Sequence, residues 1–296
     1  MTSLRYDTVS FLSDYGYSDE FVGIVKSVIR SIAPQVTVLD ITHEIPPYDV
    51  RAGALALARC AQYLCPGVVL AVVDPGVGTK RRPVAVEVGG GSSVLVGPDN
   101  GLLASAVAIS GGADRAVVLN NPAYQLPRPA ATFDGRDVFA PAAAHLACGV
   151  AIEELGDEVD PARLTPGMVP VSRNDEGEVT GEVLWIDRYG NVQLNVDPED
   201  VDGWGERIHV RFGDQTRTVL RISAFGELSV GSIGLLADSY GLASLVVDRA
   251  SAAEELGLAV GDEVILSLIP EHGDPEHREG DEASTSPVDF TRRPRR

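Results

Sequence analysis

Residues 70–81 read LAVVDPGVGTKR, and the fold prediction starts from this stretch. The apolar, β-branched run at 68–73 indicates a buried strand, which stops at a turn sequence beginning with Asp74. Ligands of open α/β sheets bind at the carboxyl ends of strands, so Asp74 is a candidate site residue. Arg81 follows seven residues later and could keep that carboxylate charged. Asp-Pro-Gly is also common turn chemistry, so an Asp74 that only caps its own backbone is the alternative.

The N-terminal half alternates between strand and helix patterns. Helical spacing of apolar residues predicts helices at 20–33, 50–64, 102–109 and 138–148. Strands are expected at 8–12, 36–41, 68–73, 83–88, 93–96 and 116–119. This alternation favours a mainly parallel sheet flanked by helices, with right-handed crossovers. Polar loops containing Asp14, Asp74 and Asp99 each follow a predicted strand, which indicates a site at the carboxyl edge of the sheet.

The C-terminal half has a different pattern. Pro, Gly and charged residues cluster without periodicity at 161–178, which predicts a domain boundary there. Short alternating runs follow at 178–187, 191–196, 207–212, 215–222, 231–237, 242–247 and 263–269, with a short helix at 252–256. We therefore expect an N-terminal α/β domain over 1–170, a smaller antiparallel β-barrel-like or sandwich domain over 178–270, and a disordered tail over 271–296.

Composition narrows the class of function. The 296 residues carry a formal net charge of -19, which argues against nucleic-acid and anionic-membrane partners. Three cysteines form no metal-type cluster and no complete disulfide framework, and no signal-peptide pattern is visible, so a cytoplasmic location is expected. The sequence contains no Walker loop, GxGxxG fingerprint, zinc spacing or nucleophile elbow, and these absences remove most familiar cofactor chemistry.

The acid-bearing loops, the spacing from Asp74 to Arg81 and the segment IDRYGNV at 186–192 occur together in one known family. Over residues 8–269 the chain resembles the S-adenosyl-L-methionine (SAM) hydroxide adenosyltransferases. These adenosine-forming SAM hydrolases are related to the fluorinases and chlorinases. The resemblance implies a homotrimer in which SAM lies between the N-terminal domain of one subunit and the C-terminal domain of its neighbour.

The resemblance also implies which residues of the N-terminal domain bind SAM. Asp14, in the loop SDYGYSD, would accept hydrogen bonds from the two ribose hydroxyls. Tyr48 would lie against the nucleoside, and Phe133 would form a wall of the pocket around C5'. Gly135 is expected in the same pocket, where its position beside Phe133 could leave space for chloride in the halogenase alternative.

Four residues of the C-terminal domain would bind the remainder of the substrate. Tyr189 would stack on adenine, and Asn191 would read the edge of the base. Asp187 would pair with the methionine ammonium, and Ser239, in ADSYGLAS, would contact the methionine carboxylate. Asp187 and Ser239 each have an ordinary turn-forming interpretation as well.

The catalytic set of the hydroxide-using enzymes is an Asp, an Arg and a His. Asp74 and Arg81 match the first two, whereas the family's TFHGRD is TFDGRD here, which places Asp134 at the histidine position. A carboxylate can orient or deprotonate water. Two acids beside Arg81 would compete for its charge, so the pKa of one of them should rise.

The function that the resemblance implies is hydrolysis of SAM to adenosine and L-methionine by attack of water or hydroxide at C5', with neither a metal nor a cofactor. The alternatives are a SAM-dependent, chlorinase-like halogenase and a non-catalytic module that binds SAM or adenosine. Halogenases lack the Asp and Arg and carry an inserted loop. Here Asp74 and Arg81 are present and the glycine turn at 89–91 is short, which favours water as the nucleophile.

Overall fold

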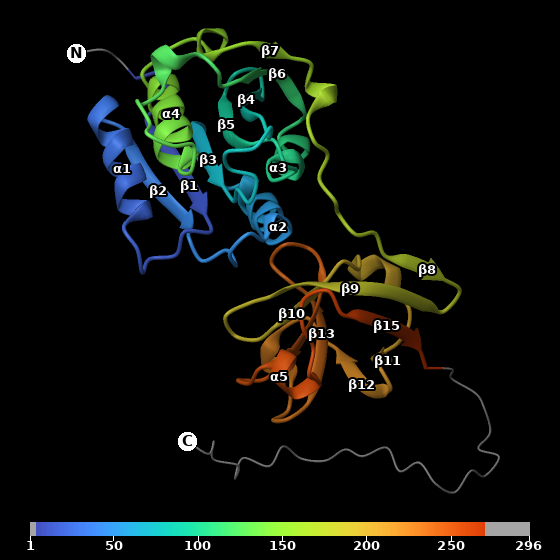
Figure 1. Cartoon of the computed structure of the whole chain (residues 1–296). Coiled ribbons are helices and arrows are strands. Elements are labelled where there is room, and N and C mark those ends of the chain that lie inside the picture. Colours follow the sequence, from blue (N-terminus) through green and yellow to red (C-terminus); the bar gives the residue numbers. More distant parts are fainter. Residues whose placement is uncertain (1–3, 270–296) are drawn as a thin grey trace, which may run out of the picture. The chain divides into compact units, whose positions relative to one another are not determined.

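The computed structural model describes residues 4–269. The described chain forms two compact units, the first ending at Val169 and the second beginning at Pro170 (Figure 1). The tail predicted at 271–296 lies outside the described residues. No helix within 4–269 has the length and apolar character needed to cross a membrane.

The first unit is built on a seven-stranded sheet, and the predicted α/β class is confirmed. The strand order is β2-β1-β3-β5-β4-β6-β7. Strands β2, β1, β3 and β5 run parallel, and β4, β6 and β7 extend the sheet with antiparallel pairings. The bounds are β1 (Thr8–Ser13), β2 (Thr37–Thr42), β3 (Val68–Val72), β4 (Pro83–Val88), β5 (Ser93–Pro98), β6 (Ala113–Val118) and β7 (Glu158–Val159).

Helices cover both faces of this sheet (Figure 1). Along β3, Leu70 points to the core shared with α1 (Phe21–Ile32) and α4 (Ala140–Ala147). Its neighbour Ala71 points to the core under α2 (Val50–Ala61) and α3 (Ala104–Ile109). A strand buried on both faces needs apolar residues throughout, which explains the continuous run at 68–73. Short helical turns are η1 (Pro122–Tyr124), η3 (Ile152–Leu155), η4 (Pro161–Arg163) and the π-helical turn η2 (Gly135–Phe139) that precedes α4.

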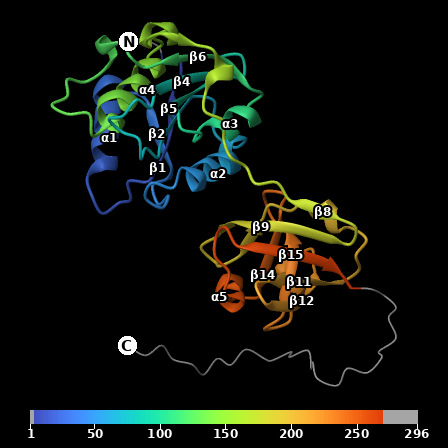
Figure 2. The same ribbon diagram turned by 45° about the vertical axis from the view of Figure 1, so that its right-hand side comes forward.

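The second unit is a closed barrel of seven strands, and an eighth strand, β8, pairs with β9 of the barrel (Figure 2). The order β10-β14-β13-β12-β11-β15-β9-β8 closes through the pairing of β9 with β10. The barrel is mixed, because β12 pairs with β13 in parallel, whereas antiparallel pairing was expected throughout. Its elements are β8 (Arg173–Asp175), β9 (Glu178–Ile186), β10 (Val192–Leu194), η5 (Pro198–Val201), β11 (Arg207–Phe212), β12 (Gln215–Arg221), η6 (Phe225–Glu227), β13 (Ile233–Ala237), β14 (Ala243–Val247), α5 (Ala252–Leu256) and β15 (Glu263–Leu268).

The strand register of the first unit decides where the site residues emerge. Ser13 on β1 pairs with Val72 on the parallel strand β3. The loops that carry Asp14 and Asp74 therefore leave the sheet side by side, at its carboxyl edge. The strand β5 ends at the same edge, where Asn100 Nδ2 donates to the carbonyl oxygen of Val73 at 2.9 Å.

Candidate active site

Asp74 and Arg81 meet in a two-point ion pair after β3. Arg81 Nε donates to Asp74 Oδ1 at 3.0 Å, and Arg81 Nη2 donates to the second carboxylate oxygen. Both side chains are almost fully buried. The loop between them needs glycine at Gly78, whose φ is +75° and where a Cβ would lie 2.5 Å from the carbonyl oxygen of Ala131. Asp74 therefore does more than cap a turn, because both of its oxygens face one guanidinium group.

Asp134 joins this pair from the start of the π-helical turn. Its Oδ2 accepts from Arg81 Nη2 at 2.9 Å, so the structure brings together the three residues with predicted catalytic roles. The Arg81 guanidinium also lies over the ring of Phe139, 5.4 Å from its centroid. Arg81 Nη1 is buried and has no hydrogen-bond partner within the described residues. A buried donor without a partner is costly, so Nη1 marks a position where a water or substrate atom would be stabilised.

The electrostatics of the cluster make Asp74 a stronger base than a free aspartate. Burial is the main cause that raises the pKa of Asp74, and the negative charge of Asp134 adds to it. Arg81 opposes both effects through its charge and its hydrogen bonds, but does not cancel them. The expected rise in the pKa of one acid is therefore found at Asp74. A buried carboxylate with raised proton affinity is suited to accept a proton from water.

Tyr15 is a site residue that the sequence analysis missed. Its ring lies edge-on to Phe133, with ring centroids 5.6 Å apart, and against Phe21 at the same distance. A Cβ built on Gly135 would lie only 2.1 Å from the Tyr15 hydroxyl oxygen, so this contact requires glycine at 135. Burial raises the pKa of Tyr15, and the nearby carboxylate of Asp14 raises it further, so the phenol stays protonated. The sequence signal that could have identified Tyr15 was its position in the SDYGYSD loop, next to Asp14.

The carboxylate of Asp14 binds the backbone of Tyr48. Asp14 Oδ2 accepts from the Tyr48 amide at 2.9 Å, and burial raises the pKa of Asp14. The Tyr48 backbone has a φ of +70°, which is uncommon outside glycine. Its side chain projects outward, with 74% of the residue exposed. The carboxylate predicted to hold ribose therefore also fixes the loop that presents this tyrosine ring.

His43 packs beneath the loops that carry Asp14 and Tyr48 and is fully buried. Its Nδ1 lies 2.7 Å from Ser13 Oγ, and its Nε2 lies 3.1 Å from Asp40 Oδ1. The contacts match a Ser-His-Asp arrangement, but Ser13 is itself fully buried, so its hydroxyl is inaccessible to a substrate. Burial lowers the pKa of His43, which favours the neutral ring. His43 is thus a packed polar residue.

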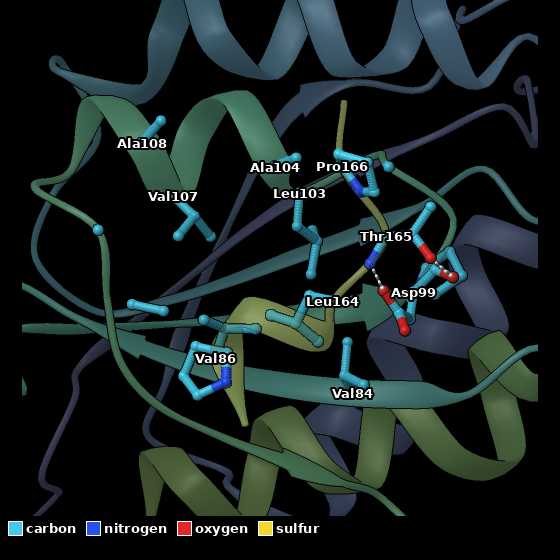
Figure 3. Close-up of a pocket in the computed structure, with 15 residues that line it drawn as sticks. Val84, Val86, Asp99, Leu103, Ala104, Val107, Ala108, Leu164, Thr165 and Pro166 are labelled. Atoms are coloured by element: carbon cyan, nitrogen blue, oxygen red, sulfur yellow. Dashed lines mark hydrogen bonds between the residues drawn. The ribbon is translucent and has the colours of Figure 1, made fainter. Parts of the chain in front are cut away.

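The third acid-bearing loop is structural. Asp99 Oδ2 accepts from Arg82 Nε at 2.8 Å, and Asp99 Oδ1 accepts from the Thr165 amide at 2.7 Å. Beside this pair lies a cavity of about 300 Å³, lined mainly by apolar side chains of β4 and α3 and by residues 161–166 (Figure 3). Asp99 lines it, but none of the residues with a predicted catalytic or SAM-binding role does. The cavity is therefore distinct from the Asp74 cluster.

In the second unit, Asp187 shapes the turn between β9 and β10. Its Oδ1 accepts from the backbone amides of Tyr189 at 2.8 Å and Asn191 at 2.9 Å. Its Oδ2 accepts from the side chain of Asn191 at 2.8 Å. The structure thus brings these three predicted binding residues together and leaves the Tyr189 ring exposed. The turn-forming interpretation of Asp187 is correct, and its predicted contact with an ammonium group stays a prediction.

Ser239 lies in a second turn of the same design, which the sequence analysis did not notice. The segments 187–190 and 238–241 read DRYG and DSYG. Asp238 Oδ1 accepts from the amides of Tyr240 at 2.8 Å and Leu242 at 3.2 Å, as Asp187 does in its own turn. Both turns contain a glycine with positive φ at the fourth position. Two neighbouring hairpins of the barrel therefore each present a tyrosine from the same kind of turn.

Comparison with known proteins places this pair of domains in a family. Residues 9–156 match the family model for the SAM hydroxide adenosyltransferase N-terminal domain, and residues 181–265 match the model for its C-terminal domain. The chain belongs to the SAM hydroxide adenosyltransferase family. The predicted resemblance is thereby confirmed.

Individual relatives agree with this assignment. The chain is 41% identical to an (R)-S-adenosyl-L-methionine hydrolase of Salinispora tropica, over 86% of this chain and 95% of the relative. It is 43% identical to a protein of the same name from Thermus thermophilus, over 87% of this chain and 98% of the relative. A crystal structure of an uncharacterized conserved protein from Thermotoga maritima matches with a TM-score of 0.81 and 31% identity, over 88% of this chain and 99% of that one.

Proposed function

We propose that this member of the SAM hydroxide adenosyltransferase family hydrolyses SAM to adenosine and L-methionine by in-line attack of water or hydroxide at C5'. The observation that carries the proposal is the buried cluster of Asp74, Arg81 and Asp134 at the carboxyl edge of the sheet. The loop with Asp14 leaves the same edge. The names of the Salinispora and Thermus relatives support SAM as the substrate.

The reaction needs little from a cofactor, because the sulfonium of SAM is already a good leaving group. The oxygen of water forms a bond to C5' as the C5'–S bond breaks, and the bonding electron pair leaves with sulfur as the neutral thioether of methionine. The proton lost by water passes to a base. The protein must therefore place one desolvated water opposite the leaving sulfur and accept its proton.

The three residues of the cluster suit these tasks. Asp74, whose pKa is raised by burial, orients the water and accepts its proton. Arg81 stabilises the developing hydroxide, with its buried Nη1 as the available donor. Asp134 holds Arg81 through a further hydrogen bond to Nη2, the atom that Asp74 also contacts. Tyr15, kept protonated, adds a neutral phenol to the wall formed by Phe133.

Substrate binding follows the assignments made from the resemblance. Asp14, Tyr48, Phe133 and Gly135 would surround the ribose and C5', while Asp187, Tyr189, Asn191 and Ser239 would bind adenine and the methionine portion. A homotrimer with SAM held between neighbouring subunits is part of this proposal. A cytoplasmic location is also proposed, since Cys60, Cys65 and Cys148 are free thiols, as a reducing compartment would keep them.

Replacement of the base tests the proposed function. We expect Asp74→Asn to abolish adenosine release, measured by chromatography, while calorimetry still detects SAM binding. Asp99→Asn is the matched control, because Asp99 is also a strand-end acid paired with an arginine but lies outside the cluster. Turnover unchanged in Asp74→Asn would refute the role of Asp74.

The mass of the product identifies the nucleophile that attacks SAM. In oxygen-labelled water containing chloride, the proposed reaction gives labelled adenosine, whereas a halogenase gives 5'-chloro-5'-deoxyadenosine. SAM binding without either product would support the non-catalytic alternative and overturn the proposed hydrolysis.

A further inference from the structure

A second arginine contacts the site from the proline-rich loop before the π-helical turn. Arg128 Nη1 donates to Asp134 Oδ1 at 2.5 Å, while Arg81 Nη2 donates to Asp134 Oδ2 at 2.9 Å. The side chain of Asp134 is 9% exposed and that of Arg128 is 35% exposed. Arg128 therefore reaches a buried carboxylate from the solvent side and occupies the oxygen that Arg81 leaves free.

The charges of the cluster balance only when this arginine is counted. Asp74 and Asp134 contribute two negative charges, and Arg81 supplies one positive charge. Burying an unpaired charge is costly, so Arg81 alone would leave one carboxylate poorly compensated. Tyr15, whose pKa is raised by burial and by the charges of Asp74 and Asp134, stays neutral and adds no positive charge. Arg136, on the adjacent turn, has its guanidinium on Asp137 at 2.6 Å.

We propose that Arg128 is a positioning residue for the SAM reaction, acting through Asp134 on Arg81. By donating to Oδ1 of Asp134, Arg128 holds the carboxylate in the orientation in which its Oδ2 binds Arg81 Nη2. The guanidinium plane is then held by Asp74 at Nε and Nη2 and by Asp134 at Nη2. Nη1, which is buried and without a partner among the described residues, is left to donate to the attacking water.

The inference rests on the proposed function, and steady-state kinetics tests it. In Arg128→Ala, Asp134 loses the contact at its Oδ1 and no longer holds Arg81 in one orientation. We expect kcat for adenosine release to fall roughly tenfold, because a misplaced catalytic group loses its near-attack geometry. KM should change less than kcat. Arg128→Lys keeps a positively charged donor at this position and should restore most of kcat.

A matched control exists at the other edge of the sheet. Glu87 is another carboxylate with 9% side-chain exposure between two arginines: Arg5 Nη2 lies 3.0 Å from its Oε1, and Arg115 Nε lies 3.1 Å from its Oε2. Arg115→Ala removes one of those arginines without touching the Asp74 cluster. Its kcat for adenosine release should match that of the unmodified protein. A tenfold loss of kcat in this control would show that the effect is general, and would overturn the inference.

A second readout separates this inference from the proposed function. The carboxyl carbon of Asp134, labelled with ¹³C and assigned with Asp134→Asn, reports the contacts of this carboxylate without any turnover. At one fixed neutral pH, we expect its chemical shift in Arg128→Ala to differ from that in the unmodified protein. An unchanged chemical shift, or an Arg128→Ala enzyme with unmodified kcat, would overturn the inference. An unmodified protein that makes no adenosine would overturn the proposed function, while the chemical shift would still decide whether Arg128 holds Asp134.

Discussion

A single methyl group at Gly135 should destabilise the first unit through Tyr15. In Gly135→Ala, the new Cβ would lie 2.1 Å from the Tyr15 hydroxyl oxygen, 3.1 Å from Tyr15 Cζ and 3.2 Å from Phe133 Cε2. The first contact is impossible without movement, and overpacking of this kind costs about 1–3 kcal/mol. Replacing glycine by alanine also lowers the entropy of the unfolded chain, which offsets about 0.5–1 kcal/mol of this cost. Because a contact of 2.1 Å is severe, the cost should lie at the upper end of its range, which leaves a net loss of about 2 kcal/mol in the free energy of unfolding.

The companion change Tyr15→Phe isolates the cause. Without the hydroxyl, the nearest atoms would be the ring carbons at 3.1 and 3.2 Å, which need shifts of only a few tenths of an ångström. In that background the penalty of Gly135→Ala should fall below about 1 kcal/mol, which gives a coupling energy above about 1 kcal/mol.

Urea unfolding of the four proteins in this cycle measures the effect. Gly23→Ala is the control, because Gly23 lies within α1 and a Cβ there meets nothing within 4 Å. That variant should be as stable as the unmodified protein or more stable. Equal penalties for Gly135→Ala with and without the Tyr15 hydroxyl would refute the proposed contact.

Two further predictions concern pH. Because burial raises the pKa of Asp74, kcat/KM for adenosine release should fall with acid at a pH above about 3.9, the value for a free aspartate. A limb at or below that value in the pH profile would contradict the role of Asp74 as base. Burial lowers the pKa of His43, so the unfolded chain binds this proton more tightly, and the free energy of unfolding should decline as pH falls below about 6.5. His43→Asn should be less stable at neutral pH by about 1–3 kcal/mol but should lose less stability between neutral and mildly acidic pH; an unchanged slope in urea unfolding would count against this account.

The strands and helices could be predicted because their residues repeat with the period of the element. The run at 68–73 and the amphipathic pattern of α1 are local signals, and the structure has β3 and α1 where these patterns lie. Strand direction is a different matter. Alternation along β12 and β13 is the same for parallel and antiparallel pairing, and only the connection at 222–232 carries the chain back for a parallel pair.

The site could be predicted in part. Asp74 and Arg81 lie on one short loop, so a spacing of seven residues was enough to pair them. Arg128 lies in a proline-rich loop without periodicity, and its contact with Asp134 depends on how that loop returns to the site. Tyr15 was missed for the same reason, since its role depends on a glycine 120 positions away in the chain. Contacts set by tertiary packing leave little local signature in a single sequence.

The backbone of Tyr48 has a consequence for how sugar recognition is measured. A side chain larger than glycine pays roughly 1 kcal/mol to remain left-handed, and the amide of Tyr48 is retained there by Asp14. Once that carboxylate is removed, the loop can relax and the aromatic ring loses its preset orientation. A weaker affinity in an Asp14 variant would therefore combine two losses, and assigning all of it to the ribose hydroxyls would overstate their contribution.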